Sequence, residues 1–146
     1  MKAKAAFWDS SAIVPLCCVQ DSSFAARQQV RVHQLQSVWW ATGLEVRNTF
    51  ARLLREKNLT KKGFEQARHR LGILAAAWFE ICPDGKVRDL AEQLLDQHAL
   101  STADGLQLAA ALVWCREQPR HRPFICADRQ LSKAAEKAGF DVQFIQ

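Results

Sequence analysis

The sequence has no apolar run long enough to cross a membrane, since a spanning helix requires roughly 18 consecutive apolar residues. Glycine and proline are scarce, at six and four among 146 residues. We find no internal repeat, low-complexity stretch or linker, so neither a repetitive chain nor a string of modules is expected. The composition is that of a globular protein, and it predicts one domain over residues 1–146 with enough length to bury a core.

Several common site motifs are also missing. The five cysteines form no CxxC pair and no Cys/His spacing typical of zinc, so we expect buried, reduced thiols. No G-x-S-x-G motif or phosphate-binding glycine loop is present. The N-terminal residues lead directly into an expected strand, which makes a cleaved signal peptide improbable. A cytoplasmic protein is therefore predicted.

Short apolar runs alternate with helical patterns from one end of the chain to the other. Strands are expected at residues 4–8, 37–41, 78–82, 124–127 and 140–145. Helices are expected to begin near Ser10, Ser22, Thr42, Thr60, Lys86, Ser101 and Gln130. This alternation predicts an α/β fold, a three-layer α/β/α sandwich with a mostly parallel central sheet of about five strands.

Four acidic residues lie where such a fold forms its site. Asp9 and Asp128 each end an apolar run, while Glu45 and Asp104 lie in the first turns of two expected helices. In an open α/β sheet, the ends of strands and the starts of the following helices meet at one crevice. We therefore expect these four carboxylates to lie together.

Each of the four also has an ordinary structural explanation. Asp9 and Asp128 are suited to capping helices, Asp104 could complete a capping box with Ser101, and Glu45 could complement a helix dipole. Their shared position favours a functional reading. Grouped carboxylates repel one another and usually hold divalent cations. Because the expected ligands are hard carboxylate oxygens, the expected cofactor is Mg²⁺ or Mn²⁺, as one or two ions.

The net charge of +5 is compatible with a polyanionic substrate. The basic residues form three denser groups, around residues 52–62, 68–70 and 116–122. A solvated surface explains each group by itself. Basic surroundings with an acidic centre suit a metal-dependent enzyme that acts on phosphodiesters.

Four segments of the sequence resemble, in order, the motif regions of PIN-domain ribonucleases, particularly the VapC-type toxins of bacterial toxin–antitoxin pairs. They are Phe7-Trp8-Asp9-Ser10-Ser11-Ala12-Ile13-Val14, Leu44-Glu45-Val46, Ala103 to Ala111 and Cys126-Ala127-Asp128-Arg129-Gln130-Leu131. The resemblance covers the whole chain. It implies that Asp9, Glu45, Asp104 and Asp128 form the acidic metal-binding quartet of an endoribonuclease that leaves a 5′-phosphate and a 3′-hydroxyl. It also implies inhibition by a cognate antitoxin and a homodimer.

Other positions follow from the same resemblance. Ser11 matches the small hydroxyl residue after the first aspartate, and it would hydrogen-bond near the site. Gln107 lies one turn after Asp104, where it could contact the carboxylates or simply be a packed polar residue. Basic side chains near Arg129 would hold the RNA backbone. Cys126 departs from the family, which usually has Ser or Thr there, and a thiol is the weaker hydrogen-bonding group.

Two other functions stay open from the sequence. A PIN-like domain whose metal site is idle could serve as an RNA- or protein-binding module, and Cys126 favours it. A haloacid-dehalogenase-type phosphohydrolase would use Asp9 as a covalent nucleophile. That chemistry usually requires a second Asp two residues later, where this chain has Ser11.

Overall fold

The structure is a computed structural model that describes residues 2–146. At its centre is a five-stranded sheet in which every strand runs parallel to its neighbours. The strands are β1 (Ala5–Trp8), β2 (Leu35–Trp39), β3 (Phe79–Ile81), β4 (Pro123–Cys126) and β5 (Asp141–Phe144), in the spatial order β3-β2-β1-β4-β5. The predicted α/β fold with a parallel sheet is therefore confirmed.

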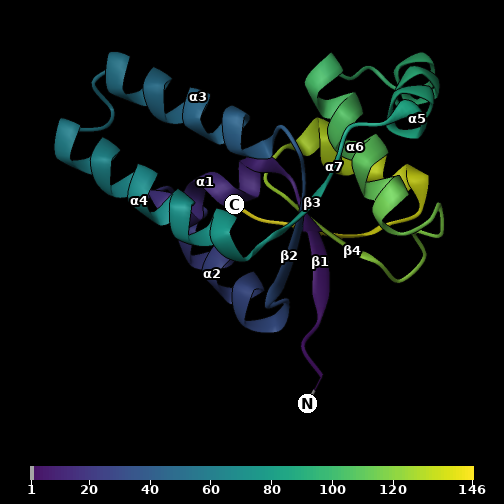
Figure 1. Cartoon of the computed structure of the whole chain (residues 1–146), viewed down its shortest axis with the longest axis horizontal. Coiled ribbons are helices and arrows are strands. Elements are labelled where there is room, and N and C mark those ends of the chain that lie inside the picture. The colour runs from purple at the N-terminus through teal and green to yellow at the C-terminus, as the bar shows by residue number, and fades with distance from the viewer. Residues whose placement is uncertain (1) are drawn as a thin grey trace.

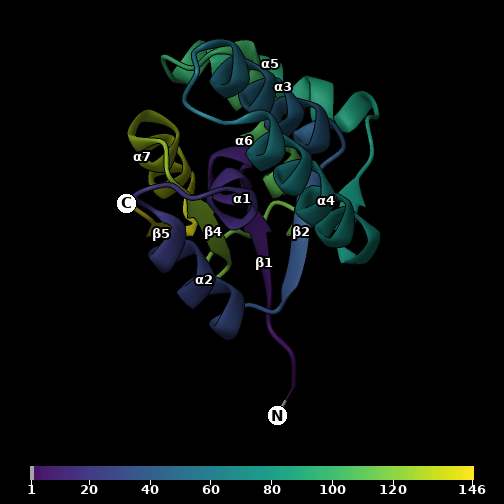
Figure 2. The same cartoon turned by 90° about the vertical axis from the view of Figure 1, so that its left-hand side faces the viewer.

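Helices cover both faces of the sheet. On one face lie α1 (Ser10–Cys17), α2 (Ser23–Val32), α3 (Thr42–Arg55) and α4 (Lys61–Ala77). On the other lie α5 (Gly85–Gln97), α6 (Thr102–Trp114) and α7 (Arg129–Ala138). Figure 1 shows the two groups on opposite sides of the strands, and Figure 2 shows the same arrangement turned by 90°. The three-layer sandwich predicted from the sequence is confirmed.

Alternate residues of the central strands face two separate cores. Phe7 and Phe124 stack with their ring centroids 5.6 Å apart in the core under α5, α6 and α7. The next residues along the chain, Trp8 and Ile125, lie in the core under α1, α3 and α4. All four side chains are fully buried, as expected for parallel strands covered on both faces. Residues just past β1 and β4 are thereby fixed at one end of the sheet, which we call the carboxyl edge.

The second strand differs from its prediction. It covers Leu35–Trp39 rather than residues 37–41, because the backbone at Ala41 is already helical and serves as the N-cap of α3. Trp40 therefore lies in the turn between strand and helix and is 50% exposed, whereas Trp39 and Trp78 are buried core residues. The apolar run alone could not show where the chain bends.

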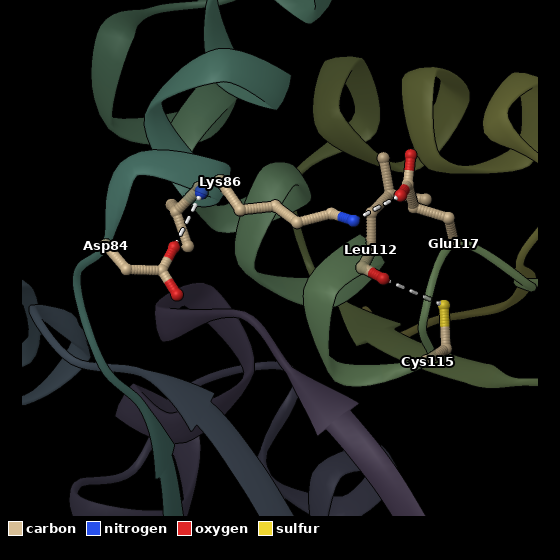
Figure 3. Close-up of polar contacts among 6 residues, drawn as sticks. Asp84, Lys86, Leu112, Cys115 and Glu117 are labelled. Atoms are coloured by element: carbon tan, nitrogen blue, oxygen red, sulfur yellow. Dashed lines mark hydrogen bonds and ion pairs between the residues drawn. The ribbon is translucent and has the colours of Figure 1, made fainter.

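Helix α5 is attached to the region that follows α6 by contacts drawn in Figure 3. Asp84 caps α5, since its Oδ1 accepts the Val87 backbone N–H at 3.0 Å. Lys86 Nζ lies 2.9 Å from Glu117 Oε2 in an exposed ion pair. Asp84 is thus a helix cap, and its side chain lies on the surface.

Helices α5 and α6 approach each other closely at Gly105. A Cβ at that position would lie 2.9 Å from Leu95 Cδ2, so a larger residue would displace Leu95. This contact fixes the first turn of α6, which carries Asp104.

The five cysteines are all free, and four of them are buried as expected, but Cys82 is exposed just after β3. Among residues 2–146, no helix combines the length and apolar character that a membrane span requires.

Candidate functional site

Two of the four predicted acidic residues follow neighbouring strands at the carboxyl edge. Asp9 comes directly after β1, and its backbone N–H donates to the Ile125 carbonyl of β4 at 3.0 Å. Asp128 lies two residues past the end of β4, which pairs with β1. Each side chain also caps a helix: Asp9 accepts the Ser11 N–H at 3.1 Å, and Asp128 accepts the Leu131 N–H at 2.8 Å. The ordinary capping role is therefore real for both residues.

Glu45 and Asp104 reach the same edge from two helices. Glu45 lies in the first turn of α3, which follows β2. Asp104 lies in the first turn of α6, where Ser101 caps the helix by accepting the Asp104 N–H at 3.2 Å. Four helix N-termini therefore face one region, and their dipoles favour negative charge there.

Asp9 is the most buried of the acids, with 2% of its side chain exposed. Its Oδ2 accepts the Ser11 hydroxyl at 2.5 Å as well as the Ser11 N–H. Its other oxygen, Oδ1, is buried and has no hydrogen-bond partner. The pKa of Asp9 is raised to about 6, mainly by burial; the bonds from Ser11 oppose the shift, and the charges of Asp104 and Asp128 add to it. A buried carboxylate oxygen without a partner is costly unless a cation or donor reaches it.

Glu45 is held by a buried amide. Gln107 Nε2 donates to Glu45 Oε1 at 2.6 Å and to Thr42 Oγ1 at 3.1 Å. Gln107 is fully buried, and its Oε1 has no hydrogen-bond partner. Burial raises the pKa of Glu45 to about 7, and nearby Asp9 and Asp104 add to that effect while the Gln107 bond opposes it. Of the two roles considered for Gln107, the structure thus shows a buried residue that contacts one of the four acids, Glu45.

The carboxylates influence one another across the whole group. Burial raises the pKa of Asp104, and the negative charge of Asp128 raises it further. Asp9 is affected by Asp104 and Asp128, and Glu45 by Asp9 and Asp104. Each of the four acidic residues thus interacts electrostatically with at least two of the others.

Cys126, the departure from the family pattern, lies between the first and last of these acids. Its Sγ is 3.8 Å from Asp9 Oδ2 and accepts the Asp128 backbone N–H at 3.3 Å. The Ser11 hydroxyl is 3.7 Å away and itself accepts the Ala127 N–H at 2.9 Å. Ser11 and Cys126 thus connect the end of β1 to the end of β4. Burial, with the charge of Asp9, raises the pKa of the thiol to about 12, so it is a neutral hydrogen-bonding group.

The donor set at this edge suits a hard divalent cation. It offers carboxylate oxygens, an unpartnered buried Asp9 oxygen and mutual repulsion that a cation would relieve. As the side chains stand in residues 2–146, no three His, Cys, Asp or Glu groups are gathered closely enough to hold one metal ion. Bringing more than two carboxylates onto a single ion would therefore require their side chains to turn.

Basic groups lie beside this region. Arg129, the residue predicted to contact substrate, is exposed at the start of α7, with its guanidinium 5.2 Å from the Phe144 ring centroid. Exposed basic residues also line the α3–α4 hairpin, at Arg47, Arg52, Lys57, Lys61 and Lys62.

Comparison with known proteins finds similarity at the level of structure. No family model matches the sequence, and no curated protein matches it. The chain is similar to the crystal structure of VapBC2 from Rickettsia felis bound to a DNA fragment from its promoter, with a TM-score of 0.65 and 13% identity over 97% of this chain and 99% of that chain. It is similar to FitAcB from Neisseria gonorrhoeae, with a TM-score of 0.63 and 18% identity over 93% and 96% of the two chains. For a toxin–antitoxin complex from Klebsiella pneumoniae, the TM-score is 0.62 at 13% identity, over 88% and 91%.

These matches establish the fold over nearly the full length of both chains. The protein has a PIN-like α/β fold, the class that the sequence motifs indicated. At identities this low, the activity and partners of the chain are matters for proposal.

Two features of the site were not foreseen from the sequence. Thr42, which is fully buried, accepts a hydrogen bond from the same Gln107 amide group that donates to Glu45. Cys126 forms hydrogen bonds with both Asp9 and Asp128. A threonine at a helix start gave no sign of a contact to a residue 65 positions later.

Proposed function

We propose that this protein is a metal-dependent endoribonuclease, the toxin of a toxin–antitoxin pair. The observation that supports it most is the Asp9 carboxylate, buried with one unpartnered oxygen among three other acidic residues. A fold that gained only a helix cap from Asp9 would have no reason to bury it beside like charges.

Asp9, Glu45, Asp104 and Asp128 are the residues that would hold Mg²⁺ or Mn²⁺, as one or two ions. When bound, such an ion lowers the pKa of a water molecule and offsets charge on the phosphodiester oxygens. Ser11 orients Asp9 through the 2.5 Å hydrogen bond, and Gln107 orients Glu45. Both donors favour the ionised carboxylate, which is the form that binds cations.

The basic residues supply the contacts to substrate. Arg129 lies next to Asp128 in sequence and is exposed, so its guanidinium is available to an RNA phosphate. The exposed arginines and lysines of the α3–α4 hairpin extend positive charge away from the acidic group. RNA would then lie across the carboxyl edge, and hydrolysis would leave a 5′-phosphate and a 3′-hydroxyl.

The partner expected from the sequence is a cognate antitoxin. Two of the similar structures support it, because one is VapBC2 bound to promoter DNA and another is named as a toxin–antitoxin complex. The homodimer and the cytoplasmic location remain predictions from the sequence.

A catalytically idle PIN-like module that binds RNA or protein is the second candidate. It is favoured by the absence, within residues 2–146, of three side chains already grouped to hold one metal ion. The two functions differ in one property: a nuclease binds divalent cations at the carboxyl edge and an idle module does not.

The test is cleavage of total bacterial RNA by the purified protein, free of antitoxin, in Mn²⁺, in Mg²⁺ and in EDTA. We expect cutting that requires metal and that Asp104→Asn abolishes. Asp84→Asn is a matched control, since Asp84 caps α5 at the surface and Asn caps a helix nearly as well as Asp. Equal cutting by Asp104→Asn and wild type, or cutting in EDTA, would contradict the proposal.

A further inference from the structure

A cavity lies at the end of the sheet opposite the acidic site, where the strands begin. It has a volume of about 480 Å³, within the range of roughly 300–1,000 Å³ typical of ligand sites. Figures 1 and 2 show the N-terminal segment running into β1 at this end. The four residues of β1 lie between Lys4 and Asp9, which places these two residues roughly 16 Å apart, so this cavity is distinct from the acidic site.

Four basic side chains line the cavity, and they come from separate parts of the chain. Lys4 precedes β1, His33 ends α2, and His121 and Arg122 lie in the turn before β4. The only acidic residue among the lining residues is Asp141, at the start of β5, and its Oδ1 accepts the Gln143 amide at 3.0 Å.

Within the described residues, none of these basic groups forms an ion pair with a carboxylate. Within residues 2–146, the one ion pair joins Lys86 of α5 to Glu117 after α6, so none of the four lies within ion-pair distance of Asp141. The Nδ1 atom of His33 is buried and has no hydrogen-bond partner. Burial lowers the pKa of His33, the positive charge of Lys4 lowers it further, and the negative charge of Asp141 opposes both effects.

Compensation of helix dipoles accounts for only part of this arrangement. His33 is the C-cap of α2, a place where basic residues are common. Lys4 precedes a strand, and Arg122 is held over the Trp114 ring, 4.2 Å from its centroid. Basic groups that surround a cavity from three directions and form no ion pair with a carboxylate are complementary to an anion.

We propose that this cavity binds the phosphate group of a nucleotide or RNA strand. A phosphate presents oxygens on several sides, so it can accept bonds from Lys4, His33 and the His121–Arg122 turn together, whereas a planar carboxylate presents only two. Asp141 can accept a hydroxyl from the attached ribose. Binding here requires none of the four carboxylates at the carboxyl edge.

The test is a titration of the full chain, followed through the imidazole NMR signals of His33 and His121 at constant ionic strength. The ligands are inorganic phosphate, 5′-AMP, and a single-stranded RNA with a 5′-hydroxyl, the last added to Asp104→Asn so that it is not cut. We expect saturable shifts of both histidines. Binding of AMP alone would assign the site to a free nucleotide, and binding of the RNA would assign it to a strand phosphate.

Lys4→Gln and Lys2→Gln form a matched pair, because both lysines are exposed and lie in the same segment. Loss of one charged hydrogen bond should weaken phosphate binding by about tenfold in Lys4→Gln, with Lys2→Gln unchanged. The proposal is overturned if no ligand shifts either histidine, if both lysine variants weaken equally, or if a glutamate-rich peptide binds as tightly as phosphate.

Discussion

The sulfur of Cys126 lies 3.8 Å from Oδ2 of Asp9, across the boundary between β4 and β1. The same sulfur accepts the backbone N–H of Asp128 at 3.3 Å. One neutral side chain thus contacts the first and last acidic segments of the site, although 117 residues separate it from Asp9. The position of the fourth carboxylate relative to the first depends on this side chain and on the Ser11 hydroxyl.

Replacing Cys126 tests that dependence. Cys126→Ser supplies a stronger hydrogen-bond donor and acceptor in the same place, so cleavage and cation affinity should be equal to wild type or higher. Cys126→Ala removes both bonds and should lower metal-dependent cleavage by roughly tenfold, the worth of about one hydrogen bond. Identical cleavage rates for the serine and alanine variants, measured on folded protein, would show that Cys126 is only a packed core residue.

The buried Asp9 predicts a pH dependence of stability in metal-free protein. Because burial raises its pKa to about 6, against about 3.9 in an unfolded chain, the folded state retains a proton that the unfolded state releases. The resulting stability is fully present below about pH 4 and is lost as the pH rises through about 6, by roughly 3 kcal/mol.

Urea unfolding of wild type and Asp9→Asn between about pH 4 and pH 8 measures this effect. Asparagine keeps the cap on α1 but carries no charge, so the variant should gain stability over wild type as the pH rises. Parallel stability curves for the two proteins would mean that Asp9 is not held at a raised pKa.

The buried contact between Gln107 and Glu45 predicts a second pH dependence of stability. Gln107→Glu replaces the amide donor with a carboxylate that faces Glu45 in a buried position, so it should destabilise the fold by about 2 kcal/mol or more near pH 8. Near pH 5 one of the two carboxyl groups can protonate and donate to the other, so the loss should be smaller. Gln107→Leu removes the donor without adding charge and should show little of this pH dependence. The same loss at both pH values in Gln107→Glu would contradict the contact.

Because Arg129 is exposed, we expect its substitution to weaken RNA binding and to leave the fold intact. Arg129→Gln removes an exposed charge beside the site, and it should weaken RNA binding and reduce the slope of log affinity against log salt by about one. Lys137→Gln is the control, since Lys137 is exposed at the other end of the same helix. If both variants bind RNA equally, the phosphate contact lies elsewhere.

The sequence predicted the fold well because its patterns are local. Alternating apolar runs and helix starts located every strand and helix to within a few residues, and the parallel sheet followed from their order. Asp9, Glu45, Asp104 and Asp128 were placed at one edge for the same reason. The bend at Ala41 escaped prediction, because Trp40 and Ala41 continue an apolar run while the backbone has already become helical.

Contacts between residues far apart in the sequence were harder to predict from it. The Gln107–Thr42 pair and the bonds of Cys126 join residues 65 and 117 positions apart, and no spacing rule predicts such pairs. The presence of the acidic residues was therefore predictable, whereas the contacts of Thr42 and Cys126 beside them were not.

Binding of Mn²⁺ to the antitoxin-free protein, measured by calorimetry, tests the central claim most directly. Wild type and Asp84→Asn should bind Mn²⁺ alike, because Asp84 is an exposed cap outside the acidic group. Asp9→Asn and Asp128→Asn keep their helix caps but lose a charge, and both should bind at least about tenfold more weakly. Absence of Mn²⁺ binding by folded wild-type protein, or equal binding by all four, would contradict a metal site built from these carboxylates and would favour the idle module.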